Sequence, residues 1–327
     1  MEQRKLGANG PDVGALGLGC MSFAGFYGPT DKAESFATLR RALDLGITHL
    51  DTALLYGMGL SETVIGEFIR DNPNEFVIAS KCGIVPKPQR HFNNKPDYVR
   101  EAVEGSLKRL GVDHIPLYYL HRREQEIPVE EAMETMAALV REGKIGGIGL
   151  SEIAPSTLER ACAVHPVMAV QNEYSLWTRL PELGLIQACK RLGVAFVAFS
   201  PVGRGIFADT APDPSSFGEN DFRRVNPRFE EPNWSTNNAR VDALRAYARD
   251  HGWSTAALAT AWTLAQGDHI IPIPGTRSPA HLDQLAQSLD IPLGPTELEE
   301  IEAILPVGFA HGDRYSAAQQ IGTELYC

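Results

Sequence analysis

The sequence has few of the features that mark disulfide-rich, membrane-spanning or secreted proteins. Its 327 residues include five cysteines and no Cys-x-x-Cys motif. Because their number is odd and they are widely scattered, we expect neither a disulfide framework nor a metal site. No segment approaches the ~18 apolar residues that a membrane-spanning helix needs, and the first residues lack the apolar core of a secretory signal. The expected location is a reducing cytoplasm. The cysteines are Cys20, Cys82, Cys162, Cys189 and Cys327.

The sequence also has fewer basic than acidic residues. The chain has 30 Lys+Arg against 41 Asp+Glu, a formal net charge of −11, and its pI is near 5.3. Nucleic-acid phosphates and anionic lipid headgroups are both bound by basic surfaces. We therefore expect neither nucleic acid nor a membrane as a partner. No pattern in the sequence indicates an oligomeric state.

Short apolar segments recur along the chain, each followed by a turn and by a segment whose apolar residues have helical spacing. Segments that are apolar throughout, without alternation, are typical of parallel strands covered on both faces. Repeated strand–helix units of this kind predict a barrel, and its usual size allows residues 1–327 to form one domain. The expected strands are Ala15–Leu18, Thr48–Leu50, Phe76–Ala79, Ile115–Leu120, Gly147–Leu150, Ala169–Val170, Ala195–Ala198 and Ile270–Ile273.

Three parts of the chain depart from this repeat. Residues Arg4–Val13 predict an N-terminal β-hairpin with Asn9-Gly10 at its turn. A long segment rich in Pro, Gly and Asn follows the seventh strand, between Pro201 and a helix near Asn238. The tail, from about Pro306 to Cys327, is also irregular. Because loops this long are usually functional or mobile, we interpret the last two as covers over one face of the barrel.

Polar residues stand where the predicted strands end. The second strand runs into Asp51, with Tyr56 shortly after it; the third reaches Lys81, and the fourth His121. Catalytic groups of strand–helix barrels lie at the carboxyl ends of the strands, which share one face. These four side chains are therefore expected to lie together.

Seven segments, in this order, resemble the aldo-keto reductase family and span nearly the whole chain. The resemblance implies a (β/α)8 TIM barrel that binds a nicotinamide cofactor without a Rossmann fold. The short motif Gly17-Leu18-Gly19 is not taken as a dinucleotide site, because it lacks the third glycine and the later acidic residue. The segments are Asp51–Gly57, Ala79–Lys81, Leu117–Arg122, Ile148–Glu152, Gln171–Trp177, Ser200–Gly205 and Ile273–Arg277.

The resemblance implies NAD(P)H-dependent, reversible reduction of an aldehyde or ketone to the alcohol. Tyr56 matches the proton donor, Lys81 and Asp51 match a pair that supports it, and His121 matches a group that orients the substrate oxygen. A free phenol has a pKa near 10 and is a reluctant donor at neutral pH. A neighbouring ammonium favours the phenolate, so Lys81 is expected to lower the pKa of Tyr56.

The same resemblance implies the residues that bind the cofactor. Arg277 can pair with the 2′-phosphate of NADPH through charge-assisted hydrogen bonds. His281 and Leu285 stand where many relatives have Arg and Asn, and Glu152 stands where many have Asn. NADPH is therefore favoured, with some tolerance of NADH. The implied cofactor residues are Ser151, Gln171, Asn172, Tyr174, Ser200, Gly203, Arg204, Gly275, Thr276, Arg277, Ser278, His281 and Gln284.

The substrate site is harder to define, and two other functions remain open. Aromatic residues on the loops suggest a pocket for a small, neutral carbonyl compound, although they could equally plug the barrel. The candidate pocket residues are Phe23, Phe26, Tyr27, Leu54, Phe92, Trp177 and Tyr315, with Arg90, Arg122 and Arg123 as possible anion-attracting groups.

A metal-dependent barrel isomerase could instead use Asp51, His121, Glu152 and Glu173 as ligands. A nicotinamide-binding accessory subunit with little turnover is the other alternative.

Overall fold

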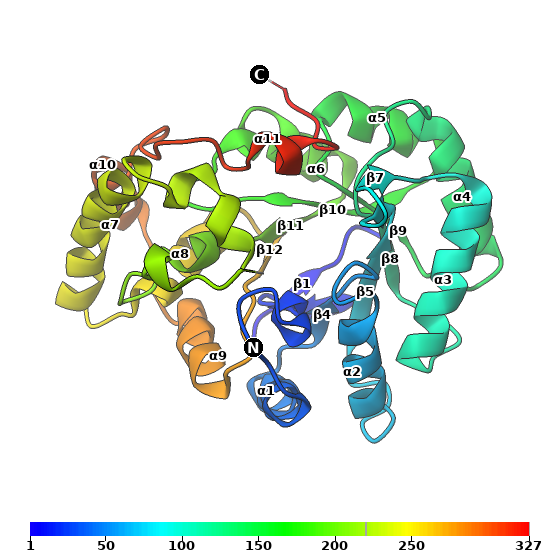
Figure 1. The fold of residues 1–327 in the computed structure, drawn as a ribbon, viewed down its shortest axis with the longest axis horizontal. Helices are drawn as coiled ribbons and strands as arrows, with labels where there is room; N and C mark the ends of the chain where they lie inside the picture. Colours follow the sequence, from blue (N-terminus) through cyan, green and yellow to red (C-terminus); the bar gives the residue numbers. More distant parts are fainter. Residues whose placement is uncertain (220, 327) are drawn as a thin grey trace.

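The computed structural model describes residues 1–219 and 221–326, and within them eight parallel strands form the central sheet. Figure 1 shows the helices arranged around the outside of these strands. The prediction of a strand–helix barrel is confirmed. In order across the sheet, the strands are β12 (Ile270–Ile273), β11 (Ala195–Phe199), β10 (Val167–Glu173), β9 (Ile148–Ser151), β8 (Leu117–Leu120), β5 (Val77–Cys82), β4 (His49–Asp51) and β3 (Leu18–Gly19).

The surrounding helices begin and end at residues suited to those positions. Asp31 caps α1 by accepting a hydrogen bond from the Glu34 amide at 2.7 Å. Helix α3 starts at Pro96 and stops before Gly111, whose φ of 69° suits a helix end. The helices are α1 (Lys32–Leu45), α2 (Leu60–Ile69), α3 (Pro96–Leu110), α4 (Val129–Arg141), α5 (Pro155–Val164), α6 (Leu185–Leu192), α7 (Asn233–Asp250), α8 (Thr255–Ala265), α9 (Pro279–Ala286), α10 (Pro295–Ile304) and α11 (Ala317–Gln320).

Two glycines join the first strand to the last. The Gly17 amide donates to the Pro272 carbonyl and the Gly19 amide to the Pro274 carbonyl, both at 3.0 Å. A Cβ atom on Gly17 would lie 2.8 Å from the Ile273 side chain, and one on Gly19 would lie 2.9 Å from the Ile273 carbonyl oxygen. The Gly-x-Gly motif therefore serves barrel closure, which explains why it lacks the other parts of a dinucleotide motif.

The predicted hairpin is present and closes the amino-terminal end of the barrel. It pairs β1 (Gln3–Lys5) with β2 (Asp12–Gly14). The Gly10 amide donates to the Gly7 carbonyl at 3.1 Å, but the connection is longer than a two-residue Asn-Gly turn. The reason is that Leu6 leaves the strand and, with Val13, packs fully buried into the barrel interior.

The strand boundaries differ from prediction mainly where polar residues occur. Strand β5 continues past Ala79 through Ser80 and Lys81, and β10 continues past Val170 to Glu173. These polar residues still pair with neighbouring strands. Lys81 and Gln171 bind Asp51 inside the barrel, whereas Ser80 donates to Glu62 of α2 on the outer side. The first strand of the barrel begins later than predicted. The sequence predicts it at Ala15–Leu18, whereas the residues that pair with β4 are Leu18 and Gly19.

Two irregular segments follow β11 and α10, as predicted. The first contains the short helices η3 (Gly203–Gly205), η4 (Pro214–Ser216), η5 (Phe222–Val225) and η6 (Pro227–Phe229), and α7 begins at Asn233, before Asn238. The second is the C-terminal tail, which Figure 1 shows in red running from α10 through α11. A small hairpin of β6 (Ile84–Val85) and β7 (His91–Phe92) follows β5.

The four cysteines in the described part of the chain are free; the fifth, Cys327, lies outside the described residues. None of the helices in residues 1–219 and 221–326 is both long and apolar enough to span a lipid bilayer.

Candidate active site

A buried ion pair stands at the centre of the barrel's carboxyl-terminal end. Lys81, on β5, donates from Nζ to Asp51 Oδ1, at the end of β4, and to the Thr52 carbonyl at 2.8 Å. The other Asp51 oxygen accepts a hydrogen bond of 2.7 Å from Gln171 Nε2 on β10. Lys81 is fully buried and Asp51 is 2% exposed. Both charges are therefore fixed in position, because a buried ion must keep its partners.

Tyr56 lies against this pair in the turn between β4 and α2. Its amide donates to the Ala53 carbonyl at 3.0 Å, which closes the turn. The Ser61 hydroxyl donates to the Cys20 carbonyl at 2.9 Å and accepts from the Thr52 hydroxyl at 2.8 Å, so the start of α2 is tied to β4. Lys81 Nζ lies 5.3 Å from the centroid of the Tyr56 ring.

His121 completes the predicted group of four. Its ring meets the Tyr56 ring edge-on, with centroids 5.9 Å apart. The side chain is 8% exposed, and its Nδ1 atom has no hydrogen-bond partner. Asp51, Tyr56, Lys81 and His121, from the ends of three strands, are thus brought together as predicted. A buried nitrogen without a partner is unusual in a folded protein and is found most often at functional sites.

The surroundings set the protonation of these groups. Burial, with the nearby charge of Asp51, raises the pKa of Tyr56 well above its usual value. Burial lowers the pKa of Lys81, although Asp51 opposes that effect. Burial, with the charges of Arg122 and Lys81, holds the pKa of His121 well below its usual value. The expected lowering of the Tyr56 pKa is therefore wrong for this state, because Asp51 balances the ammonium and the phenol is buried.

The segment from Gly275 to Gln284 provides groups that could hold an anionic phosphate. Arg277 is 28% exposed; its Nε lies 3.4 Å from Glu34 Oε2, and its Nη1 donates to the Tyr27 carbonyl at 3.2 Å. The Ser278 side chain caps the start of α9, and the Thr276 hydroxyl accepts from the Ser278 amide at 3.0 Å. A guanidinium beside a helix N-terminus suits a phosphate by charge and by donor geometry. His281 is exposed on the first turn of α9, and Gln284 is half-buried on the next.

The three predicted polar residues of β9 and β10 have different surroundings. Gln171 faces Asp51, inside the barrel. The Ser151 hydroxyl accepts a hydrogen bond of 3.3 Å from Arg122 Nη1. Asn172 is already used internally: its Oδ1 accepts from the Glu152 amide at 2.9 Å, and its Nδ2 donates to the Ile153 carbonyl at 3.3 Å. Asn172 therefore shapes the loop after β9.

Tyr174 is not brought to the site. Its ring packs between Phe196 and Trp262, with centroids 5.8 and 5.3 Å away. Its hydroxyl donates to Glu182 at 2.7 Å, and the side chain belongs to the layer between strands and helices. The prediction that Tyr174 is a cofactor-binding residue is corrected accordingly. Neighbouring residues on a strand point to opposite faces, and Glu173 takes the inward position.

The structure reveals an ion cluster that the sequence reading missed. Glu173 accepts hydrogen bonds from Arg204 Nη2 at 2.7 Å and from Arg314 Nη1 at 3.0 Å, and Arg314 Nη2 also pairs with Glu152. Burial opposes ionisation of Glu152, but Arg314 and Arg122 outweigh it and lower the pKa. The sequence indicates both glutamates as alternative metal ligands and Glu152 as a departure from the family's Asn, but it predicts no ion pair for either. Nothing local in the sequence marks Arg314, which is 162 residues from Glu152.

The segment after β11 has an unusual backbone. Ser200, Gly203, Arg204 and Gly205 all have positive φ, at 54°, 56°, 57° and 99°. Two of these are glycines, which adopt such angles without strain. The amides of Gly203 and Gly205 donate to the Ser200 and Val202 carbonyls, at 2.9 and 3.0 Å, and close a tight turn. The Arg204 side chain is committed to Glu173, so it does not extend toward a cofactor phosphate.

The candidate pocket residues divide into two groups. Phe26 packs against Tyr56 with centroids 5.8 Å apart, and Tyr315 lies 5% exposed beside Arg204 and Arg314. Trp177 instead packs against Phe207 and Phe229 as part of the core. Among the arginines, Arg122 is buried beside His121, whereas Arg90 and Arg123 bind the tail.

The carboxylates that a metal site would need are paired with cations of the chain itself. Asp51 pairs with Lys81, and Glu152 and Glu173 pair with Arg314. Within residues 1–219 and 221–326, no group of three or more His, Cys, Asp or Glu side chains could hold a metal ion.

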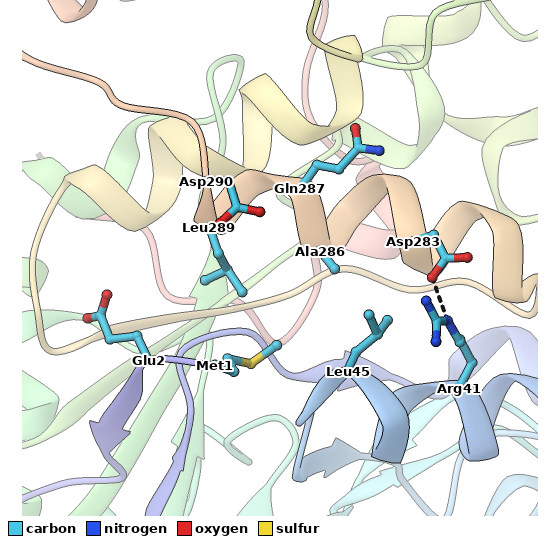
Figure 2. Close-up of a pocket in the computed structure, with 9 residues that line it drawn as sticks. All are labelled: Met1, Glu2, Arg41, Leu45, Asp283, Ala286, Gln287, Leu289 and Asp290. Carbon is cyan, nitrogen blue, oxygen red and sulfur yellow. Dashed lines mark hydrogen bonds and ion pairs between the residues drawn. The ribbon is translucent and has the colours of Figure 1, made fainter.

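A hollow of about 450 Å³ lies elsewhere, between the N-terminus, α1 and the region of α9. Figure 2 shows Arg41 of α1 reaching Asp283 of α9 across one end of it, where the Nε–Oδ1 distance is 2.6 Å. None of the predicted site residues lines this hollow, which is lined by Met1, Glu2, Arg41, Leu45, Asp283, Ala286, Gln287, Leu289 and Asp290.

Comparisons with known proteins agree with the geometry. A sequence model of the Aldo/keto reductase family matches residues 15–306. The chain is 39% identical over 320 residues to Probable aldo-keto reductase 1 of Glycine max, covering 95% of this chain and 91% of that protein. It is 38% identical over 320 residues to the Schizosaccharomyces pombe aldo-keto reductase yakc, whose name carries NADP(+), covering 95% and 94%. The glycerol dehydrogenase AKR11B4 from Gluconobacter oxydans superimposes with a TM-score of 0.84 at 26% identity, over 93% of this chain and 94% of that one. The chain therefore belongs to the aldo-keto reductase family.

Proposed function

We propose that the protein reduces an aldehyde or ketone to the alcohol, reversibly, with NADPH as the cofactor and Tyr56 as the proton donor. The observation that carries the assignment of Tyr56 is the buried Asp51–Lys81 pair, in which Lys81 Nζ lies 5.3 Å from the centre of the Tyr56 ring. Family membership and the NADP(+) in the name of the Schizosaccharomyces pombe relative support the reaction and the cofactor.

Each member of the group has a separate role in this proposal. NADPH supplies the hydride when it is bound. Tyr56, whose raised pKa keeps it protonated, gives its proton to the carbonyl oxygen as that oxygen becomes basic. Lys81 then stabilises the phenolate by its charge, and Asp51 holds Lys81 in place. His121 donates a hydrogen bond to the same oxygen and orients it.

The cofactor is held, in this proposal, by several strand ends. Arg277 and the start of α9 take the 2′-phosphate, where Glu34 now pairs with Arg277 at 3.4 Å. Thr276, Ser278, Gly275, His281 and Gln284 flank that site. The backbone of Ser200, Gly203 and Arg204 covers the pyrophosphate, while Ser151 and Gln171 face the nicotinamide. Asn172 supports them indirectly through the loop after β9.

The proposal also covers the partners of the protein, its location in the cell and the extent of its domain. The substrate is a small carbonyl compound, and the net charge of −11 supports the absence of a nucleic-acid partner. The four free cysteines of the described residues support a reducing location such as the cytoplasm. Residues 1–327 act as a single barrel domain. No observation favours an accessory subunit or a metal-dependent isomerase.

Tyr56→Phe should reduce turnover by about 10²–10⁴-fold, because it removes the proton donor, while NADPH still binds. Turnover is followed by the absorbance of the reduced nicotinamide, and binding by quenching of tryptophan fluorescence. Tyr174→Phe is the matched control: it loses one hydrogen bond, to Glu182, outside the site. The control should keep full turnover and NADPH affinity. Wild-type turnover in Tyr56→Phe would show that the proton comes from another group.

His121 should remain neutral across the physiological range. Burial and the nearby charges of Arg122, Lys81 and Arg90 depress its pKa. Its ring signals in NMR spectra should therefore not titrate between about pH 8 and pH 6, where a free imidazole begins to protonate. The unfolded chain takes up this proton near pH 6.5 and the folded chain does not. The contribution of His121 to stability is therefore lost progressively as pH falls below about 6.5. A midpoint near 6.5 in the folded protein would contradict the buried environment.

Arg277→Ala should weaken NADPH binding far more than NADH binding, since only NADPH carries the 2′-phosphate. The difference should be about ten- to a hundredfold for a charge-assisted contact. Arg41→Ala is the control, because Arg41 lies on the same α1–α9 interface but pairs with Asp283. Both cofactors are titrated into each protein. Equal losses for the two cofactors in Arg277→Ala would reject this phosphate site.

A further inference from the structure

The Glu173 carboxylate connects the two irregular segments at the mouth of the barrel. One guanidinium partner, Arg204, comes from the segment after β11, and the other, Arg314, comes from the C-terminal tail. The side chains of Glu173 and Arg204 are 0% and 1% exposed, and that of Arg314 is 11% exposed. The two segments are 110 residues apart in sequence, yet they share one carboxylate.

Hydrogen bonds from side chains of the segment after β11 to carbonyl groups of the tail join the same two segments directly. The Arg314 carbonyl accepts from Arg204 Nη1 at 2.9 Å and from Asn226 Nδ2 at 2.6 Å. Arg228 Nε donates to the Gly312 carbonyl at 3.2 Å. The Arg204 guanidinium also lies 4.9 Å from the centre of the Tyr315 ring. The tail and the segment after β11 therefore form one continuous cover.

The charged groups in this cover cannot separate at little cost. Two carboxylates, Glu152 and Glu173, face two guanidiniums, Arg204 and Arg314. If the tail left alone, Glu152 would lose its guanidinium and Glu173 one of its two, inside the protein, where uncompensated charge is expensive. Outward movement of the segment after β11 is thus coupled to movement of the tail.

We propose that Arg314 is a positioning residue for the cofactor: through Glu173 and Arg204, the tail holds closed the segment that covers the pyrophosphate. This inference rests on the proposed function for the identity of the ligand. It implies that a residue of the tail controls the release of NADPH as well as access to the carbonyl site.

The tail has a second anchor that provides a control. Arg123, in the loop after β8, pairs through Nε with Glu324 Oε1 at 2.5 Å, and Glu324 Oε2 accepts from the Ala154 amide at 2.8 Å. This anchor fixes the end of the tail to the opposite loops and does not involve Glu173 or Arg204. Replacing either arginine loosens the tail, but only replacement of Arg314 removes the ion pairs that connect the tail, through Glu173, to the segment after β11.

The test compares Arg314→Gln with Arg123→Gln in the full-length protein. The dissociation rate of NADPH is measured by displacing it with excess NADP(+) while tryptophan fluorescence is recorded. Arg314→Gln should raise that rate by about 2- to 30-fold, the usual range for a coupling residue. Arg123→Gln should leave it at the wild-type value. Melting temperatures are recorded for both, so that a general loss of stability is distinguished from a loss of coupling.

Limited trypsin digestion provides a readout that needs no cofactor. In Arg314→Lys, which keeps a cleavable bond, cutting should become faster both after position 314 and after Arg223 or Arg224 in the segment after β11. Lysine is a single point charge and cannot reproduce the two-way contact of the guanidinium. In Arg123→Gln, only the tail should be cut faster. If Arg314→Gln does not fold, NADPH dissociation is measured in Arg314→Lys, where it should again be faster than in the wild type.

An unchanged NADPH dissociation rate in the folded Arg314 variant would overturn the inference, as would equal acceleration in the two variants. A wild-type protein that fails to bind NADPH would instead overturn the proposed function. In that case the digestion experiment still decides whether the two segments move together.

Discussion

The arrangement of the active site depends on one buried ion pair, Lys81 with Asp51. Neither charge reaches solvent, so each is stable only while the other stays in place. The pair takes one residue from β5 and one from β4, and Gln171 of β10 contacts it from across the barrel. The register of these strands is therefore linked to the geometry of the site. Tyr56 and His121 then need only pack against the pair to form a proton-donating group.

A second set of buried charges organises the cover of the barrel in the same way. Glu152 and Glu173 extend from the ends of β9 and β10, and each receives a guanidinium from a segment that lacks regular structure. Few backbone hydrogen bonds of the sheet or helix type are available to order such segments. Ion pairs, together with hydrogen bonds from side chains to carbonyl groups of the tail, order these segments instead. The active site and its cover are therefore both held together by buried ion pairs at the ends of neighbouring strands.

The sequence predicts the barrel and the four central residues of the site, but it does not predict the ion pairs that hold the cover. Apolar strand segments and polar strand ends are local patterns, and the shared edge of parallel strands brings Asp51, Lys81 and His121 together. Tyr174 was assigned to the cofactor site by the resemblance, but it directly follows β10 and is three residues from the inward-facing Gln171, so its side chain lies on the outer face. Arg314 could not be found, since its partners are distant in sequence. The pKa of Tyr56 also depends on burial, which only the structure provides.

The most direct test of this account is a double-mutant cycle with Tyr56→Phe and Lys81→Met. Turnover of a simple aldehyde is measured for the wild type, both single variants and the double variant, with NADPH binding used to confirm folding. If Lys81 acts through Tyr56, the double variant should be about as slow as the slower single variant, because residues that act as a unit are not additive. Losses that multiply would contradict the account and would mean that Lys81 and Tyr56 contribute independently.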